Sequence, residues 1–207
     1  MKTIFRVALI TSCAFASCKT EDKCNCYPEA ILESTTDILD YRDAWKFLTS
    51  KEELYLLSRP SWVPADGKQC ITSKLISAEF PEINRSLEYT DPFLNNDNRK
   101  RKEIKITVQQ KPHSRSKSTY FTAEGLPSMG KKFPIVYSDT RCLIYQMPKP
   151  NAHGERTQCA LWAKKDYKDR PLTYCKYILN FFCGINHYTQ YNPAAHKDAC
   201  EKLIRKA

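Results

Sequence analysis

The fold is decided by residues 141–175, which read RCLIYQMPKPNAHGERTQCALWAKKDYKDRPLTYC. Two segments of this stretch, Leu143–Met147 and Ala160–Ala163, alternate between two faces with the period of two expected of half-buried strands. The connection Lys149–Thr157 contains proline, asparagine and glycine, which favour turns. The stretch therefore predicts an antiparallel hairpin, and the segment after it carries a third cysteine.

Further segments have the composition or alternation of strands. The clearest is Glu103–Gln110, where isoleucine and valine alternate strictly with polar residues. Proline, glycine or aspartate follows closely after each of the others, which are Glu53–Arg59, Lys68–Phe80, Ser86–Thr90, Ser118–Glu124 and Phe133–Tyr137. About eight antiparallel strands in one chain predict a single all-β domain, closed as an eight-stranded up-and-down barrel.

Helical sequence follows the last predicted strand. Pro171 suits the start of a helix, Tyr174–Phe182 continues it, and Gly184 ends it. We expect this C-terminal helix to pack against the outside of the barrel. A second helical piece, His196–Ile204, carries Cys200, so a disulfide there would tie the end of the chain to the barrel wall.

A short helix is also predicted before the first strand. Apolar residues from Ile38 to Leu48 recur at helical spacing, and Thr36 or Asp37 stands where a capping side chain is needed. Trp45 lies on the apolar side of this helix, and we expect it to be a core residue.

The first eighteen residues have the pattern of a secretory signal peptide. Lys2 and Arg6 precede the apolar run Val7–Phe15, which ends in small residues. The run is shorter than the roughly 20 apolar residues that a membrane-spanning helix needs. The alternative is a bacterial lipoprotein signal, because Phe15–Cys18 loosely imitates a lipobox. We predict a secreted protein with a signal at 1–18 and one domain at 19–207.

The chain contains ten cysteines, which suits an oxidising compartment. Cleavage after Cys18 would leave eight, enough for four disulfides, whereas cleavage after Ala16 would leave nine with Cys18 unpaired. Eight cysteines allow about a hundred pairings, so the sequence does not fix the connectivity. A zinc site at Cys24-Asn25-Cys26 is the weaker alternative, because one intervening residue is fewer than zinc motifs have. We therefore predict no metal and no cofactor.

The central stretch resembles a known family. The runs Cys142-Leu143-Ile144 and Ala160-Leu161-Trp162, followed by Cys175, match the frame of the amine-binding signature of the tick salivary lipocalins, the histamine-binding family. The helix DAWKFL (43–48) and the early Cys70 belong to the same resemblance. It implies an eight-stranded lipocalin barrel that sequesters a small host mediator.

The same resemblance implies part of the disulfide pattern. It pairs Cys70 with Cys200 and Cys142 with Cys175. The remaining four cysteines are then left to pair among themselves; they are Cys24, Cys26, Cys159 and Cys183.

The signature also has a gap, because Leu143 and Ala160 stand where the family's amine binders have acids. If both face the interior, strand alternation turns Tyr145 and Trp162 inward as well. The resemblance adds Tyr120, Phe133, Ile135 and Tyr137 to the wall. A buried ammonium without a carboxylate costs several kcal/mol. An apolar mediator such as a leukotriene or a fatty acid is therefore favoured over histamine or serotonin.

Other charged residues leave alternatives open. Glu79 and Glu103 lie on strands that border the barrel, so either could replace the missing acids, although exposure to solvent is the simpler expectation. Lys105 and Lys164 are candidates to meet a ligand carboxylate. The sequon at Asn84, in the expected turn after Lys68–Phe80, predicts N-glycosylation.

The chain is basic, with a formal charge of +10, of which the signal peptide accounts for two basic residues. For a secreted protein, the anionic partners of interest are glycosaminoglycans or anionic mediators, not nucleic acid. We expect the protein to be a monomer. The basic runs Arg99–Lys102 and Lys111–Lys117 suggest the alternative of a protein-binding module, such as a complement modulator with a vestigial cavity. No catalytic motif is present and the four histidines are scattered, so we predict no enzymatic activity.

Overall fold

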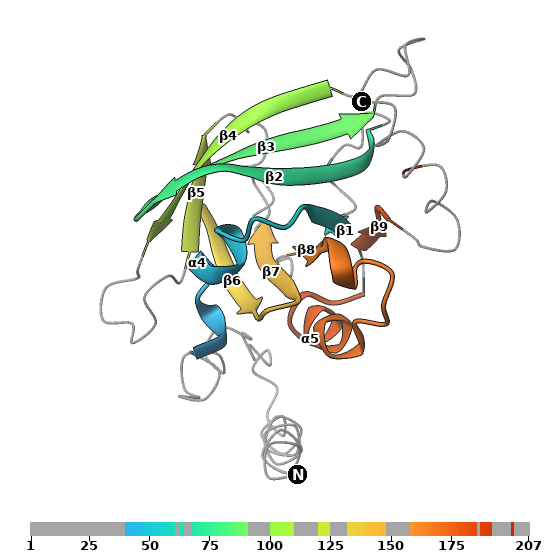
Figure 1. Ribbon diagram of the computed structural model, residues 1–207. Helices are drawn as coiled ribbons and strands as arrows, with labels where there is room; N and C mark the ends of the chain where they lie inside the picture. Colours follow the sequence, from blue (N-terminus) through green and yellow to red (C-terminus); the bar gives the residue numbers. More distant parts are fainter. Residues whose placement is uncertain are drawn as a thin grey trace. The chain divides into compact units, whose positions relative to one another are not determined.

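In the described residues, the chain forms one closed antiparallel barrel. The computed structural model describes residues 40–60, 63, 68–90, 100–109, 120–124, 132–147, 158–185, 187–191 and 200, and the statements below concern these residues. The strands are β1 (Leu54–Pro60), β2 (Gln69–Glu79), β3 (Glu82–Thr90), β4 (Lys100–Gln109), β5 (Tyr120–Glu124), β6 (Lys132–Ser138), β7 (Cys142–Met147), β8 (Gln158–Lys164) and β9 (His187–Thr189). Each strand from β1 to β7 pairs with the next, and β8 pairs with β1, which closes the barrel (Figure 1).

The predicted hairpin organises this sheet as expected. β7 and β8 pair without interruption, with Leu143 opposite Trp162 and Tyr145 opposite Ala160. β9 is a short addition on the edge of β1, since Ser58 pairs with β8 on one side and with Thr189 on the other. The eight-stranded barrel is therefore confirmed.

The two ends of the barrel are defined by the directions of its strands. Because successive strands alternate in direction, β2, β4 and β6 end, and β3, β5 and β7 begin, at one end, which we call the α4 end. The helix α4 (Trp45–Leu48), preceded by the short helix η1 (Asp40–Arg42), lies at this end (Figure 1). The strands β1, β3, β5 and β7 end, and β2, β4, β6 and β8 begin, at the opposite end, which we call the rim.

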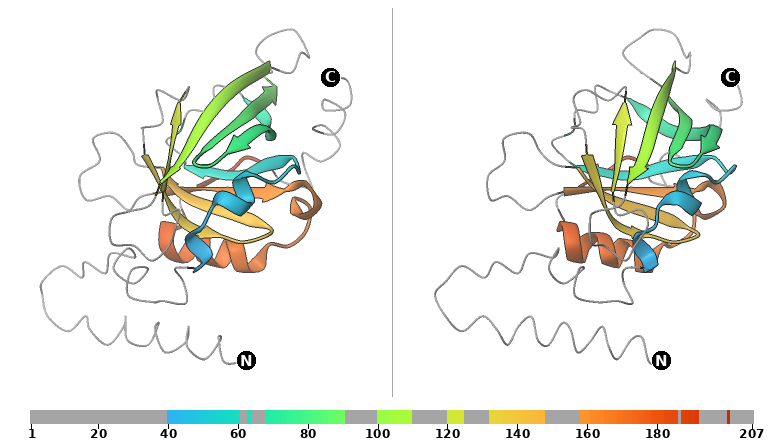
Figure 2. Two further views of the ribbon diagram at one scale, coloured as in Figure 1. Left: turned by 60° about the vertical axis from the view of Figure 1, so that its left-hand side comes forward. Right: turned by 90° about the vertical axis from the view of Figure 1, so that its left-hand side faces the viewer.

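The C-terminal helix α5 (Thr173–Cys183) packs outside the barrel, as predicted. In both views of Figure 2, β6, β7 and β8 lie between α5 and the strands β2 to β4. The short helix η3 (Lys165–Tyr167) follows β8 and precedes α5. Gly184 ends α5 with a φ of 75°, a conformation that glycine adopts without a Cβ penalty. No helix in the described ranges is long and apolar enough to cross a membrane.

Disulfides fix this helix and the end of the chain. Cys142–Cys175 and Cys159–Cys183 join α5 to β7 and β8, and Cys70–Cys200 joins β2 to the C-terminal segment. The two pairings implied by the resemblance are confirmed, and the third comes from the four cysteines left open. Cys24 and Cys26 lie outside the described residues, as do the predicted signal peptide and the second predicted helical piece apart from Cys200.

The first helix differs in detail from the prediction. The expected caps Thr36 and Asp37 lie outside the described residues, and Asp43 Oδ1 instead accepts a hydrogen bond of 2.9 Å from the backbone nitrogen of Trp45. Trp45 is only half-buried, and its ring meets Phe80 edge-on at 5.1 Å between centroids. Phe47 and Leu48 hold the fully buried positions.

The sequon is the other correction to the fold. Asn84 lies within β3, opposite Lys105, and not in a turn. The turn comes earlier, at Phe80 and Pro81, because the β2–β3 hairpin continues to the pair Glu79–Glu82. The Asn84 amide donates a hydrogen bond of 3.0 Å to Ser77 Oγ on the outer face. Glycosylation of Asn84 stays a prediction.

Candidate functional site

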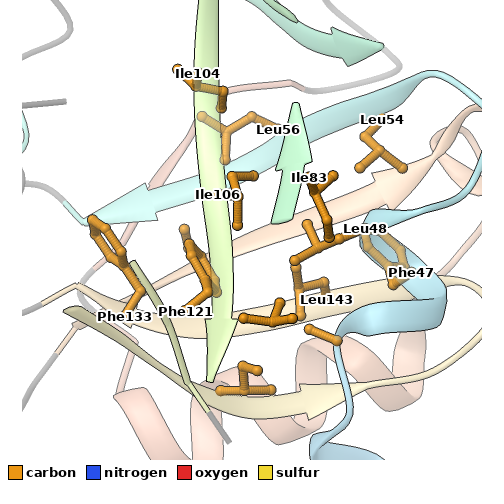
Figure 3. Close-up of a cluster of buried hydrophobic side chains, with 14 of the residues drawn as sticks. Phe47, Leu48, Leu54, Leu56, Ile83, Ile104, Ile106, Phe121, Phe133 and Leu143 are labelled. Carbon is orange, nitrogen blue, oxygen red and sulfur yellow. The ribbon is translucent and has the colours of Figure 1, made fainter. Parts of the chain in front are cut away.

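The barrel interior is lined by apolar side chains from every strand from β1 to β8 and from α4. Sixteen of these residues are buried and form one cluster. Figure 3 shows its members from opposite walls, such as Ile106 on β4 and Leu143 on β7, pointing into one space. Half-buried side chains that pack against the cluster are Trp45, Ile71, Leu75, Leu87, Ala123, Tyr145 and Trp162.

Of the eight aromatic and apolar residues predicted for the wall, four belong to the cluster and two pack against it. Phe133, Ile135, Leu143 and Ala160 are at most 1% exposed. Tyr145 and Trp162 lie beside them, on the same face of the hairpin, as the alternation of β7 and β8 predicted. These positions agree with the prediction, while contact of the six side chains with a ligand stays a prediction.

Tyr145 forms the polar point of this otherwise apolar wall. The Trp162 indole Nε1–H donates a hydrogen bond of 3.1 Å to its hydroxyl oxygen. The Tyr145 ring meets Phe121 and Phe133 edge-on, at 4.9 and 5.7 Å between ring centroids. Burial raises the pKa of Tyr145 to about 12, so its hydroxyl stays neutral and can donate a hydrogen bond inward.

Tyr120 lies on the outer face of β5, so its predicted place in the wall is wrong. Its neighbour Phe121 belongs to the interior cluster, so strand alternation turns Tyr120 outward, where Lys132 Nζ lies 3.9 Å from its ring centroid. Phe121 was therefore the interior residue that the sequence reading missed. The signal was present, because Glu124 shares a face with Tyr120 and a charged side chain marks the outer face.

Tyr137 is also outside the interior, for a different reason. Ile135 pairs with Tyr145 but Tyr137 pairs with Ile144, so β6 advances two residues while β7 advances one. This β-bulge reverses the alternation. The Tyr137 ring stacks on Tyr41 at 5.5 Å and meets Tyr174 of α5 at 5.7 Å.

The two candidate acids lie outside the interior. Glu79 is exposed near the tip of the β2–β3 hairpin, and the Glu103 side chain is 70% exposed beside Arg101. The alternation of β4 explains Glu103, because Ile104 and Ile106 occupy the inner face. Both carboxylates thus follow the simpler expectation of exposure to solvent.

The two candidate lysines have carboxylate partners of their own. Lys105 Nζ lies 2.6 Å from Glu82 Oε1 on the outer face, and Lys164 Nζ lies 3.2 Å from Glu52 Oε1. The second oxygen of Glu52 is buried and has no hydrogen-bond partner among the described residues. The backbone oxygen of Glu52 accepts a hydrogen bond of 3.4 Å from Arg85 Nη2.

Arg85 is a buried charge that the sequence reading missed. It is 1% exposed and lies on the inner face of β3, between Ile83 and Leu87. Its Nε–H donates to Ser73 Oγ at 2.9 Å, and its four other N–H groups donate to backbone oxygens of Leu48, Ser50, Glu52 and Ser73. None of these acceptors is a carboxylate.

The surroundings of Arg85 tie α4 to the barrel. Burial lowers the pKa of the Arg85 guanidinium to about 10, so it remains charged at neutral pH. Its five bonds join the chain after α4 to β2 and β3, which closes the α4 end. The alternation Ile83, Arg85, Leu87 in the sequence was the signal for an inward arginine.

The described residues offer no convincing metal site. Asp139, Cys142 and Cys175 bring three potential ligand atoms within 4.8 Å of one another. The two sulfurs are bonded to each other, however, and a disulfide does not supply the thiolates that zinc requires.

A closed eight-stranded antiparallel barrel with an apolar interior and an outer helix defines a lipocalin-like binding protein. A family model described as tick histamine binding protein matches residues 32–197, and the chain belongs to this family. It is a family of binding proteins and not of enzymes, in agreement with the prediction. A search of curated protein sequences finds no match.

Two solved structures are similar to the chain. Japanin from Rhipicephalus appendiculatus, solved bound to cholesterol, has a TM-score of 0.52 and 16% sequence identity, covering 68% of this chain and 91% of japanin. The siderocalin Ex-FABP has a TM-score of 0.37 and 12% identity, covering 75% of this chain and 81% of its own. At these identities, the likeness to japanin bears on the fold alone.

Proposed function

We propose that this protein is a secreted, monomeric lipocalin that sequesters a small host inflammatory mediator in its barrel at a feeding site. The observation that carries the proposal is the apolar interior, where sixteen buried hydrophobic residues, Leu143 and Ala160 among them, form one cluster. Membership of the tick histamine-binding family and three disulfides support a secreted binding protein.

The favoured ligand is an apolar mediator, such as a leukotriene or a fatty acid, and not a protonated amine. Leu143 and Ala160 present hydrocarbon where the family's amine binders have acids, so an ammonium would lose its hydration without gaining a counter-charge. Arg85 adds a positive charge to the inner face of β3, which repels an amine further. Burial of ligand methylenes contributes about 0.8 kcal/mol each.

Amine binding through another acid is the second candidate. The observation that favours it is Glu52, whose Oε2 is buried and has no hydrogen-bond partner among the described residues. An ammonium there would have to compete with Lys164, which already contacts the other oxygen at 3.2 Å. The protein-binding alternative rests on basic segments, of which 100–102 begins β4 and 111–117 lies outside the described residues.

The first test is calorimetry with a leukotriene, histamine and serotonin on one preparation from eukaryotic expression. We expect the leukotriene to bind at least about a hundredfold more tightly than either amine, because an unpaired buried ammonium costs several kcal/mol. Nanomolar histamine affinity would contradict the proposal. Loss of that affinity in Glu52→Gln would then assign the amine to Glu52.

The second test restores the missing acids. Leu143→Asp with Ala160→Glu should raise amine affinity by about tenfold or more and weaken leukotriene binding. Leu143→Asn with Ala160→Gln is the matched neutral control and should not gain amine affinity. Near-ultraviolet circular dichroism establishes that each variant is folded. A folded acidic variant that gains no amine binding would mean that these side chains do not reach the ligand.

A further inference from the structure

Toward the rim, the inner face of β4 changes from apolar to basic residues. The two strands pair without a bulge from Glu82–Thr107 to Tyr89–Lys100. Directly opposed residues in such a ladder share a face. The inner face of β4 therefore runs from the buried Ile106 and Ile104 to Lys102 and Lys100, both exposed.

These two lysines have no carboxylate partner in the described part of the chain. On the same strand, Arg101 and Glu103 lie on the outer face and pair with each other at 3.7 Å. The carboxylate of Glu88 on β3 also lies on the outer face, where it pairs with Lys74 at 3.5 Å. Two ammonium groups thus stand on the inner face directly beyond the apolar interior.

A third lysine approaches the same place from β2's side. Lys68 precedes β2 at the rim, and its Nζ lies 5.5 Å from the ring centroid of Tyr89. Tyr89 lies directly opposite Lys100 and shares the inner face with Leu87. Aromatic and aliphatic surface is therefore continuous with the cationic groups.

The opposite end does not offer an equivalent subsite. All five N–H groups of Arg85 already donate to protein oxygens, so its guanidinium has no donor left for a ligand. The α4 end is also covered by Phe47 and Leu48, which are 1% and 4% exposed. An anionic group in the barrel finds available donors at the rim.

We infer that Lys100 and Lys102, beside Tyr89, form a head-group subsite for an amphipathic carboxylate whose hydrocarbon chain lies in the barrel interior. The inference rests on the proposed function, because it assumes that the interior accepts an apolar chain. The interior supplies most of the affinity through burial of methylenes. The lysines supply selectivity for a carboxylate over an alcohol of the same chain length.

The experiment compares dodecanoate with 1-dodecanol on two variants of the full mature chain. Lys100→Gln/Lys102→Gln removes two charges from the inner face of β4. The matched control, Arg101→Gln/Lys105→Gln, removes two charges from the outer face of the same strand. Competition fluorescence gives both dissociation constants. We expect the inner-face variant to weaken dodecanoate binding roughly three- to tenfold, with 1-dodecanol unchanged and the control like wild type.

Equal dodecanoate affinity in all three proteins, with 1-dodecanol bound, would overturn the head-group subsite and leave the proposed function standing. Failure of wild-type protein to bind either compound would overturn both. A third arm uses anionic phospholipid vesicles. Loss of vesicle binding in the inner-face variant, with dodecanoate binding unchanged, would overturn the subsite in favour of a membrane-surface contact.

Discussion

The two ends of the barrel hold positive charge in opposite ways. At the α4 end, Arg85 is 1% exposed, and its N–H groups all donate to neutral oxygens of the chain. At the rim, Lys100 and Lys102 are exposed and pair with no described carboxylate. One charge therefore holds segments of the fold together, whereas the others remain available to a partner.

The difference shows that a charge's role in a binding barrel depends on what satisfies its donors. A buried guanidinium with five neutral acceptors is saturated, so it acts through its charge and through the segments that it joins. A hydrated ammonium at a rim has little effect on stability, but it can exchange water for a ligand oxygen. Substitutions at the two ends should therefore separate stability from binding.

The largest effect is expected at Arg85. Arg85→Met should lower the free energy of unfolding by about 4 kcal/mol, because it leaves several buried carbonyl oxygens without donors. The measurement is urea denaturation with the disulfides intact. Arg101→Met, which removes a 58% exposed arginine from β4, is the matched control and should cost less than about 0.5 kcal/mol. A loss below about 1 kcal/mol for Arg85→Met would remove the distinction between the two ends.

A smaller loss of stability is expected when leucines at the two ends of the barrel are replaced by alanine. Leu54 near the α4 end is 2% exposed, whereas Leu87 on β3 toward the rim is half-buried. Leu54→Ala should cost about 2–4 kcal/mol and Leu87→Ala about 1 kcal/mol, because only the first leaves a closed void. Thermal unfolding of the ligand-free protein provides the comparison. Equal losses would mean that the interior is packed to the same density from end to end.

The barrel and its hairpin were predictable because period-two alternation and turn residues are local signals. The pairing of Leu143 with Trp162 and the inward face of Tyr145 follow from that alternation once one residue is placed. The pairing of the third disulfide, Cys159–Cys183, was not predictable, because cysteine spacing does not show which cysteines meet in space.

The predictions of which side chains face the interior failed in two situations. Either no residue of known orientation fixed the faces of a strand, or a bulge interrupted the alternation. The resemblance placed Tyr120 on the wall, and the alternation of STYFTAE did not correct it, because aromatic residues stand on both faces of this segment. Tyr137 was placed on the wall by the resemblance, and it lies outside the interior because the β-bulge after Ile135 adds a residue to one strand alone. Arg85 was missed because a charged side chain is usually placed in solvent, and its partners come from a distant segment, residues 48–52.

The smallest effect is expected for the two acids outside the interior. Glu79→Gln and Glu103→Gln should each change the free energy of unfolding by less than about 0.5 kcal/mol, since both side chains are exposed. Neither should change the affinity for a leukotriene or for histamine. Calorimetry and urea denaturation on the same samples would measure both quantities.

Glu103 tests the comparison most directly, because it lies between Lys102 and Ile104 but on the other face of β4. If the alternation of β4 continues unbroken to the rim, Glu103→Gln should leave the affinity for a carboxylate ligand unchanged, whereas Lys102→Gln should weaken it. A matching loss of carboxylate or amine binding in Glu103→Gln would mean that β4 twists or slips near the rim. The lysines would then no longer be on the ligand's side, and only the apolar interior and the closed α4 end would remain to explain binding.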